Sequence, residues 1–208
     1  MRPLARTAAL IAVAAGVLGA TADVVMLAAP GFARDPAAAQ LLVSVPRITA
    51  GFLLGVTAIP VYMVGYWAVY DVLKPARYTG LLLGLSLFGI VQGTTFHGLA
   101  GSAAYLIQTQ QPADPMAFVL PYLPIMLPPF VVLHLILGVG TILLVLIRQQ
   151  EGVDLPLWLV LISPGIGTAA LYAIGLVIAP LGDYLLPAAM NLAHAAFFAA
   201  FVTRAQTG

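Results

Sequence analysis

The chain has 208 residues, of which 62% are hydrophobic and only 7% carry a charge. Eight Lys and Arg against seven Asp and Glu leave the net charge near zero, which argues against a nucleic acid as partner. The sequence has no cysteine, so disulfides, thiolate metal sites and cysteine catalysis are excluded. This composition is typical of integral membrane proteins and far from that of soluble globular proteins. The lipid bilayer is therefore the expected environment.

The N-terminal stretch MRPLARTAALIAVAAGVLGATADVV resembles a signal peptide in its arginines, its apolar region and its small residues. The apolar character, however, continues from Ala5 to Ala29. A helix of that length crosses a hydrocarbon core of about 30 Å and is longer than a usual signal-peptide core. We therefore expect this segment to be a retained span.

Further apolar runs, separated by prolines and charges, predict five more spans. The six expected spans are about 5–29, 48–73, 79–107, 125–147, 156–179 and 184–203. No stretch remains that could form a soluble domain. The predicted fold class is all-α: one transmembrane domain over residues 1–208, built as a bundle of six transmembrane helices.

The basic residues predict how this bundle is oriented. If the spans alternate in direction, one side carries Arg2, Arg6, Lys74, Arg77, Arg148 and Arg204, and the other side carries Arg34 and Arg47. Because Lys and Arg concentrate in cytoplasmic loops, we expect both termini in the cytoplasm.

Small residues recur at helical spacing in the first three spans. They are Gly16 and Gly19 in the first span, Gly51 and Gly55 in the second, and Gly89, Gly93 and Gly101, in line with His97, in the third. Such faces allow helices to approach closely. We expect them to face protein, and they could also support an oligomer.

Ionisable side chains are rare within the spans, and each costs about 3 kcal/mol at mid-bilayer on insertion scales. They are Asp23, His97, His134 and His194. Counted from the outer span ends at 1.5 Å per residue, the three histidines lie about 15 Å deep, and Asp23 and Asn191 about 10 Å deep. The sequence therefore predicts a convergent polar pocket in the outer half of the bilayer.

Roles for these residues follow from their chemistry. His97 is expected to be the central group, with Asp23 and His194 as its catalytic partners if the protein is an enzyme. The expected substrate-binding residues are Asn191, Thr94, Gln92 and Arg47, the last reaching down towards Asp23. Tyr62, Tyr66, Trp67 and Tyr70 resemble an interfacial aromatic belt and receive no chemical role.

Several chemistries stay open for this pocket. Imidazoles of His97, His134 and His194 could together bind a divalent transition metal such as zinc, although no short motif such as H-E-x-x-H is present. Acid and base chemistry without a metal, and a b-type haem held by two histidines, are alternatives. A carrier for a small solute or lipid would use the same groups only for hydrogen bonding. A purely structural polar layer also explains them. The expected function is the binding of a small lipophilic ligand, with or without a reaction on it.

Short motifs along most of the chain also point to a family. They are GATAD (19–23), RITAGFLLG (47–55), YMVGYWAVYDVLKPA (62–76), FHG (96–98), LPLWLVLISPG (155–165) and NLAHAAFF (191–198). Together they resemble an uncharacterised family of small six-span bacterial membrane proteins. This resemblance implies the six-span architecture and a bacterial inner membrane, and it transfers no catalytic residue. It includes Asp23, His97, Asn191 and His194, whereas His134 falls outside it.

Overall fold

The computed structural model describes residues 2–204, which form helices and connecting loops without any strand. The long helices are α1 (Pro3–Leu27), α3 (Val45–Ala58), α4 (Tyr62–Leu73), α5 (Thr79–Gln110), α7 (Leu123–Arg148), α9 (Pro164–Val177) and α10 (Gly182–Arg204). The short helices are α2 (Pro36–Ala39), α6 (Pro115–Val119) and α8 (Leu157–Leu161), with 3-10 turns at Gln40–Leu42, Ile59–Val61 and Leu120–Tyr122. The predicted all-α fold class is confirmed.

Five helical stretches of the described chain are long and apolar enough to cross a membrane. They are Pro3–Leu27, Val45–Leu73, Thr79–Gln110, Pro115–Arg148 and Gly182–Thr203. They match five of the six predicted spans. Two of these stretches are composite, because α3 continues into α4, and α6 into α7, through a 3-10 turn.

The sixth predicted span, 156–179, is divided between α8 and α9. The break lies at Ser163, whose backbone is extended, with φ −53° and ψ 152°. The ring of Pro164 causes this, since a proline disfavours the helical conformation of the residue before it. With 14 residues, α9 alone is too short to cross a hydrocarbon core.

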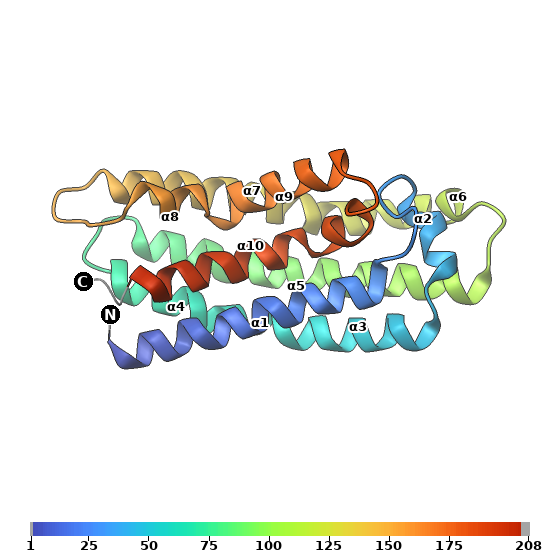
Figure 1. The fold of residues 1–208 in the computed structure, drawn as a ribbon, viewed down its shortest axis with the longest axis horizontal. Helices are drawn as coiled ribbons and strands as arrows, with labels where there is room; N and C mark the ends of the chain where they lie inside the picture. Colours follow the sequence, from blue (N-terminus) through green and yellow to red (C-terminus); the bar gives the residue numbers. More distant parts are fainter. Residues whose placement is uncertain (1, 205–208) are drawn as a thin grey trace.

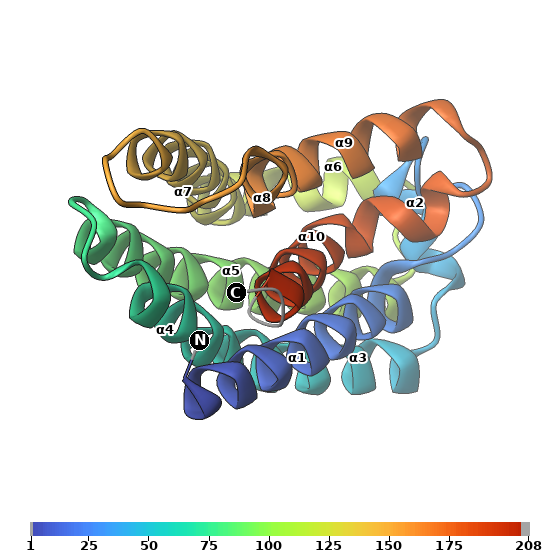
Figure 2. The ribbon, with the colours of Figure 1, turned by 60° about the vertical axis from the view of Figure 1, so that its left-hand side comes forward.

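The helices run along one long axis of the molecule (Figure 1). Both termini, the connection between α4 and α5 and that between α7 and α8 lie at one end, and α2 and α6 lie at the other. Figure 2 shows α7, α8 and α9 along one side and α1, α3 and α4 along the opposite side, with α5 and α10 between them. One end of the bundle therefore carries Arg2, Arg6, Lys74, Arg77, Arg148 and Arg204, and the other end carries Arg34 and Arg47. This is the separation that alternating spans predict.

Polar contacts secure both ends of the bundle. At the end with the termini, Arg2 forms a two-pronged ion pair with Asp71, which also receives a 3.1 Å bond from Lys74. At the opposite end, the Asp183 carboxylate accepts hydrogen bonds from the backbone N–H groups of Gly31 (3.0 Å) and Ala33 (2.9 Å). These two bonds attach the start of α10 to the loop that follows α1.

The predicted small-residue faces pack inside the single chain. A Cβ atom at Gly16 would lie 2.8 Å from the Cβ of Ala195 on α10, and one at Gly51 would lie 2.5 Å from the carbonyl oxygen of Ala22 on α1. These glycines therefore allow α1 to approach both α3 and α10.

Candidate functional site

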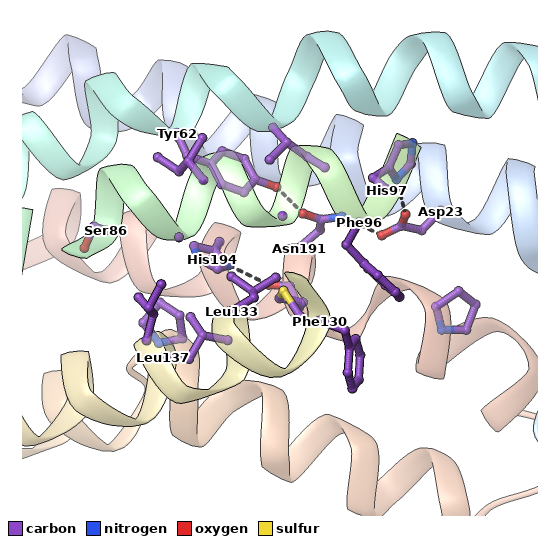
Figure 3. A pocket seen from close by; sticks show the side chains of 18 of the residues that line it. Asp23, Tyr62, Ser86, Phe96, His97, Phe130, Leu133, Leu137, Asn191 and His194 are labelled. Carbon is purple, nitrogen blue, oxygen red and sulfur yellow. Dashed lines mark hydrogen bonds and ion pairs between the residues drawn. The ribbon is translucent and has the colours of Figure 1, made fainter. Parts of the chain in front are cut away.

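A chain of hydrogen bonds joins side chains from four helices near the middle of the bundle (Figure 3). Asp23 Oδ1 on α1 lies 2.9 Å from His97 Nδ1 on α5. The other carboxylate oxygen of Asp23 accepts a 2.5 Å bond from the Asn191 amide nitrogen on α10. The Tyr62 hydroxyl on α4 donates to the Asn191 amide oxygen at 2.6 Å. The convergence predicted for Asp23, His97 and Asn191 is present.

His97 also contacts a third helix. Its Nε2 lies 3.2 Å from the carbonyl oxygen of Gly51 on α3. Both ring nitrogens of His97 are occupied by the protein, which makes His97 a clamp between α1, α3 and α5.

Two glycines make room for this chain of bonds. A Cβ atom at Gly55 would collide with the imidazole of His97. A Cβ atom at Gly19 would lie 2.7 Å from the Tyr62 hydroxyl and 2.9 Å from the side chain of Asn191. The glycines of α1 and α3 therefore serve the polar chain directly, beyond their part in helix packing.

His194 differs from His97 because one of its ring nitrogens is free. Its Nδ1 donates to the carbonyl of Met190, one turn earlier in α10, at 2.8 Å. The ring stacks on Tyr62, with centroids 5.0 Å apart, and meets Tyr66 edge-on at 5.9 Å. Within residues 2–204, Nε2 has no hydrogen-bond partner, and in the neutral ring this atom is an acceptor.

A cavity of about 380 Å³ lies beside these residues, between α1, α4, α5, α7, α9 and α10. Its polar wall contains Asp23, Tyr62, His97, Asn191 and His194. Its opposite wall, on α7, is formed mainly by Phe130, Leu133, Ile136, Leu137 and Leu144. Figure 3 shows Phe130, Leu133 and Leu137 across from His194 and Tyr62. The arrangement is an apolar chamber with hydrogen-bonding groups on one side.

His134 does not belong to this cavity wall. Its Nδ1 bonds to the carbonyl of Phe130 at 2.8 Å, and its ring stacks on Tyr172 of α9 at 6.0 Å. The bond to its own helix directs the ring towards α9, and its Nε2 is buried without a hydrogen-bond partner among the described residues 2–204. No group of three His, Cys, Asp or Glu residues within residues 2–204 is placed to hold a metal ion. The structure thus does not bring His97, His134 and His194 together as the three-histidine hypothesis requires.

A family model matches residues 1–206, and its description reads "Family of unknown function (DUF6796)". The chain belongs to this family. Neither a curated protein nor a solved structure matches it. Membership in DUF6796 agrees with the resemblance seen in the motifs and assigns no reaction.

Three residues predicted to bind substrate lie elsewhere in this DUF6796 member. Arg47 does not reach Asp23: its guanidinium donates to the carbonyls of Ala28 (2.9 Å) and Val24 (3.3 Å) and so caps the end of α1. Thr94 bonds to the Ile90 carbonyl of its own helix at 2.9 Å. Neither Thr94 nor Gln92 lines the cavity.

Tyr62 belongs to the site although the sequence pattern gives it no chemical role. It resembles a residue of an interfacial belt, yet it follows Pro60 in the middle of the second span, where a hydroxyl has no water to bind. A buried tyrosine hydroxyl needs a partner, and Asn191 provides it. The depth of Tyr62 within its span was the signal that could have identified it.

Proposed function

We propose that this protein is a multi-pass protein of a bacterial inner membrane, with both termini in the cytoplasm, that binds one small lipophilic ligand in its central cavity. The observation that carries the proposal is the free Nε2 of His194 on the wall of an otherwise mainly apolar cavity of about 380 Å³. Cavities of about 300–1,000 Å³ with a few polar groups are typical of ligand sites.

The polar and apolar groups on the cavity wall indicate the chemical class of the ligand. A bulky apolar body fits against the α7 wall, because burying apolar surface there requires no polar partner. An O–H or N–H group on the ligand would donate to His194 Nε2, which otherwise stays unpaired. The ligand is therefore a lipophile with at least one hydrogen-bond donor.

In this proposal His97, Asp23 and Asn191 act as positioning residues. Their hydrogen bonds are already made within the protein, at 2.9 Å between His97 and Asp23 and 2.5 Å between Asn191 and Asp23. They hold α1, α5 and α10 in register and so fix the wall that carries His194. This is a role in binding, and it requires neither a metal nor a reaction.

Photoaffinity labelling of the protein in its native membrane tests the proposal. The probe is a long-chain primary alcohol that carries a diazirine, irradiated with and without excess unlabelled alcohol. We expect labelled peptides to map to cavity-wall residues such as Leu133, Ile136 and Phe197, and the label to be lost on competition. Labelling confined to outward-facing residues such as Leu135 and Leu176, unaffected by competitor, would overturn the proposal.

Measurements on the purified protein separate the proposal from its alternatives. A visible absorption spectrum that shows haem would favour the redox alternative, and stoichiometric zinc would favour metal-assisted chemistry. A chemically altered alcohol recovered after incubation would show an enzyme. We expect the purified protein to be colourless and free of metal. We also expect the bound alcohol to be recovered unaltered and to be displaced by competitor.

A further inference from the structure

The proposed function, on which this inference rests, uses the polar groups near His194 and leaves two buried hydroxyls of the same cavity wall without a role. They belong to Tyr66 on α4 and Ser86 on α5. We infer that these hydroxyls form a second polar contact with the ligand. The ligand therefore carries a carbonyl or ether oxygen that accepts a hydrogen bond here, in addition to the donor group that binds His194.

The two hydroxyls leave one proton without an acceptor. Tyr66 and Ser86 are only 7% and 8% exposed, and the Ser86 hydroxyl is the hydrogen-bonding neighbour of the Tyr66 hydroxyl. Two hydroxyls hold two protons, and a contact between them uses only one. Within residues 2–204, neither hydroxyl makes a further hydrogen bond. Since an unpaired O–H is costly in an apolar environment, this position suits a ligand that brings an acceptor oxygen.

The other hydroxyls on the cavity wall are in a different situation. Tyr62 and Thr141 already make side-chain hydrogen bonds within the protein. Tyr172 on α9 is partly exposed, so its hydroxyl is not confined to the cavity. Tyr66, in contrast, lies in one buried cluster with Leu82 and Leu144. A ligand in the cavity is therefore well placed to supply the missing acceptor to the Tyr66 and Ser86 pair.

The second contact lies at a different level of the cavity from the first. Tyr66 lies one helical turn, about 6 Å at 1.5 Å per residue, beyond Tyr62 towards the end with the termini. The ring of His194 stacks on Tyr62 and meets Tyr66 edge-on, with centroids 5.0 and 5.9 Å apart. One small molecule can therefore contact His194 and the hydroxyl pair together, through two oxygens that are a few atoms apart.

The charge of the wall indicates the kind of acceptor. Among the described residues that line the cavity there is no Lys or Arg. A carboxylate or phosphate of a ligand would be buried there without a positively charged partner, which is strongly unfavourable. The acceptor is therefore an uncharged oxygen, and a hydroxy ester or hydroxy ether is the chemical class that fits both contacts.

Competition against the diazirine alcohol, with the protein in nanodiscs, tests this inference. Three competitors carry both groups and vary the spacing between them: 2-hydroxyethyl, 4-hydroxybutyl and 6-hydroxyhexyl decanoate. Butyl decanoate lacks the hydroxyl, and n-tetradecanol lacks the carbonyl. The test variant is Tyr66→Phe, which removes only the hydroxyl and keeps the ring. The matched control is Tyr70→Phe, one turn further along α4 and outside the cavity wall.

In the wild type and in Tyr70→Phe, we expect at least one hydroxy ester to compete about tenfold better than n-tetradecanol and better than butyl decanoate. In Tyr66→Phe this advantage should be lost, while n-tetradecanol competes as it does in the wild type. Equal competition by n-tetradecanol and every hydroxy ester in the wild type, or an advantage that survives in Tyr66→Phe, would overturn the second contact and leave the proposed function standing. Failure of every hydroxyl-bearing competitor in the wild type would instead overturn the proposed function.

Discussion

At the scale of single residues, the site is explained by the need to satisfy every polar group that the bilayer cannot hydrate. Asp23 uses both carboxylate oxygens, on His97 and Asn191, and His97 uses both ring nitrogens, on Asp23 and Gly51. An unpaired polar group in this position would cost several kcal/mol of solvation. Among the residues that line the cavity, His194 keeps one ring nitrogen without a partner within residues 2–204, and this makes it the residue that can respond to a ligand.

Replacing Gly55 with Ala tests the clamp at His97. The new methyl group collides with the imidazole and forces it away from the Gly51 carbonyl, so we expect the free energy of unfolding to fall by about 1–3 kcal/mol. Gly84→Ala, made at an open position of α5, should instead gain about 0.5–1 kcal/mol from helix propensity. The melting temperatures of the two variants, followed by tryptophan fluorescence, decide the matter. Equal melting temperatures would show that the ring is not held there.

Replacing His194 with Phe tests the ligand contact. The flat ring can still stack on Tyr62, while the acceptor nitrogen is lost, and the bond given up in the protein is only that to the Met190 carbonyl of the same helix. We expect the affinity for n-dodecanol to fall about tenfold, which corresponds to about 1.4 kcal/mol, with a nearly unchanged melting temperature. Competition labelling measures the affinity. Unchanged affinity would remove His194 from the site.

The sequence predicted part of this site because depth in a span can be counted from the span ends. Counting selected Asp23, His97, Asn191 and His194, which all line one cavity. It also selected His134, which lies outside the wall, because depth does not determine the direction in which a side chain points. That direction depends on the rotation of the helix and on the bond from His134 to Phe130, and neither can be read from spacing.

At the scale of helices, prolines have different consequences at different positions. Pro128 and Pro129 lie inside α7 without ending it, Pro60 lies in a 3-10 turn between α3 and α4, and Pro164 separates α8 from α9. Apolar length alone therefore predicted five spans correctly and took α8 and α9 for one helix. The proline ring of Pro164 makes the break, and a 2.9 Å hydrogen bond between the hydroxyls of Ser163 and Thr141 fixes the junction to α7.

The junction of α9 with α7 can be tested at Gly165. A Cβ atom there would lie 2.6 Å from the carbonyl oxygen of Leu137, so Gly165→Ala pushes the two helices apart and should lower the free energy of unfolding by about 1–3 kcal/mol. Gly138→Ala, on α7 with nothing within 4 Å, should be neutral or stabilising. Thermal unfolding of both variants checks this contrast. If both variants gain stability, the close approach of α9 to α7 is not present.

At the scale of the whole molecule, the arrangement of the ends carries a prediction about the membrane. The described chain has both termini at one end, with the connection between α7 and α8, while α2 and α6 lie at the opposite end. The excess of basic residues at the first end supports a cytoplasmic position for it. Because the sequence has no cysteine, any cysteine introduced by mutation is unique.

Two such variants test the orientation. Glu151→Cys lies between α7 and α8, and Ala113→Cys lies before α6, both at exposed positions. In intact cells, a maleimide that cannot cross membranes should react with Cys at position 113 and reach the one at 151 only after the membrane is opened. The reverse pattern would invert the topology, and labelling of both positions from outside would contradict a fold that separates them by the bilayer.

The central claim is that the cavity holds a ligand, and native mass spectrometry of the purified protein tests it most directly. Gly93 lies on the cavity wall, where an added Cβ would make only ordinary contacts, so the larger side chain of Gly93→Leu occupies the cavity itself. We expect the wild type and the outward-facing Gly84→Leu control to retain one molecule of added n-dodecanol, and Gly93→Leu to retain none. Equal retention by all three proteins, or retention by none of them, would contradict the account.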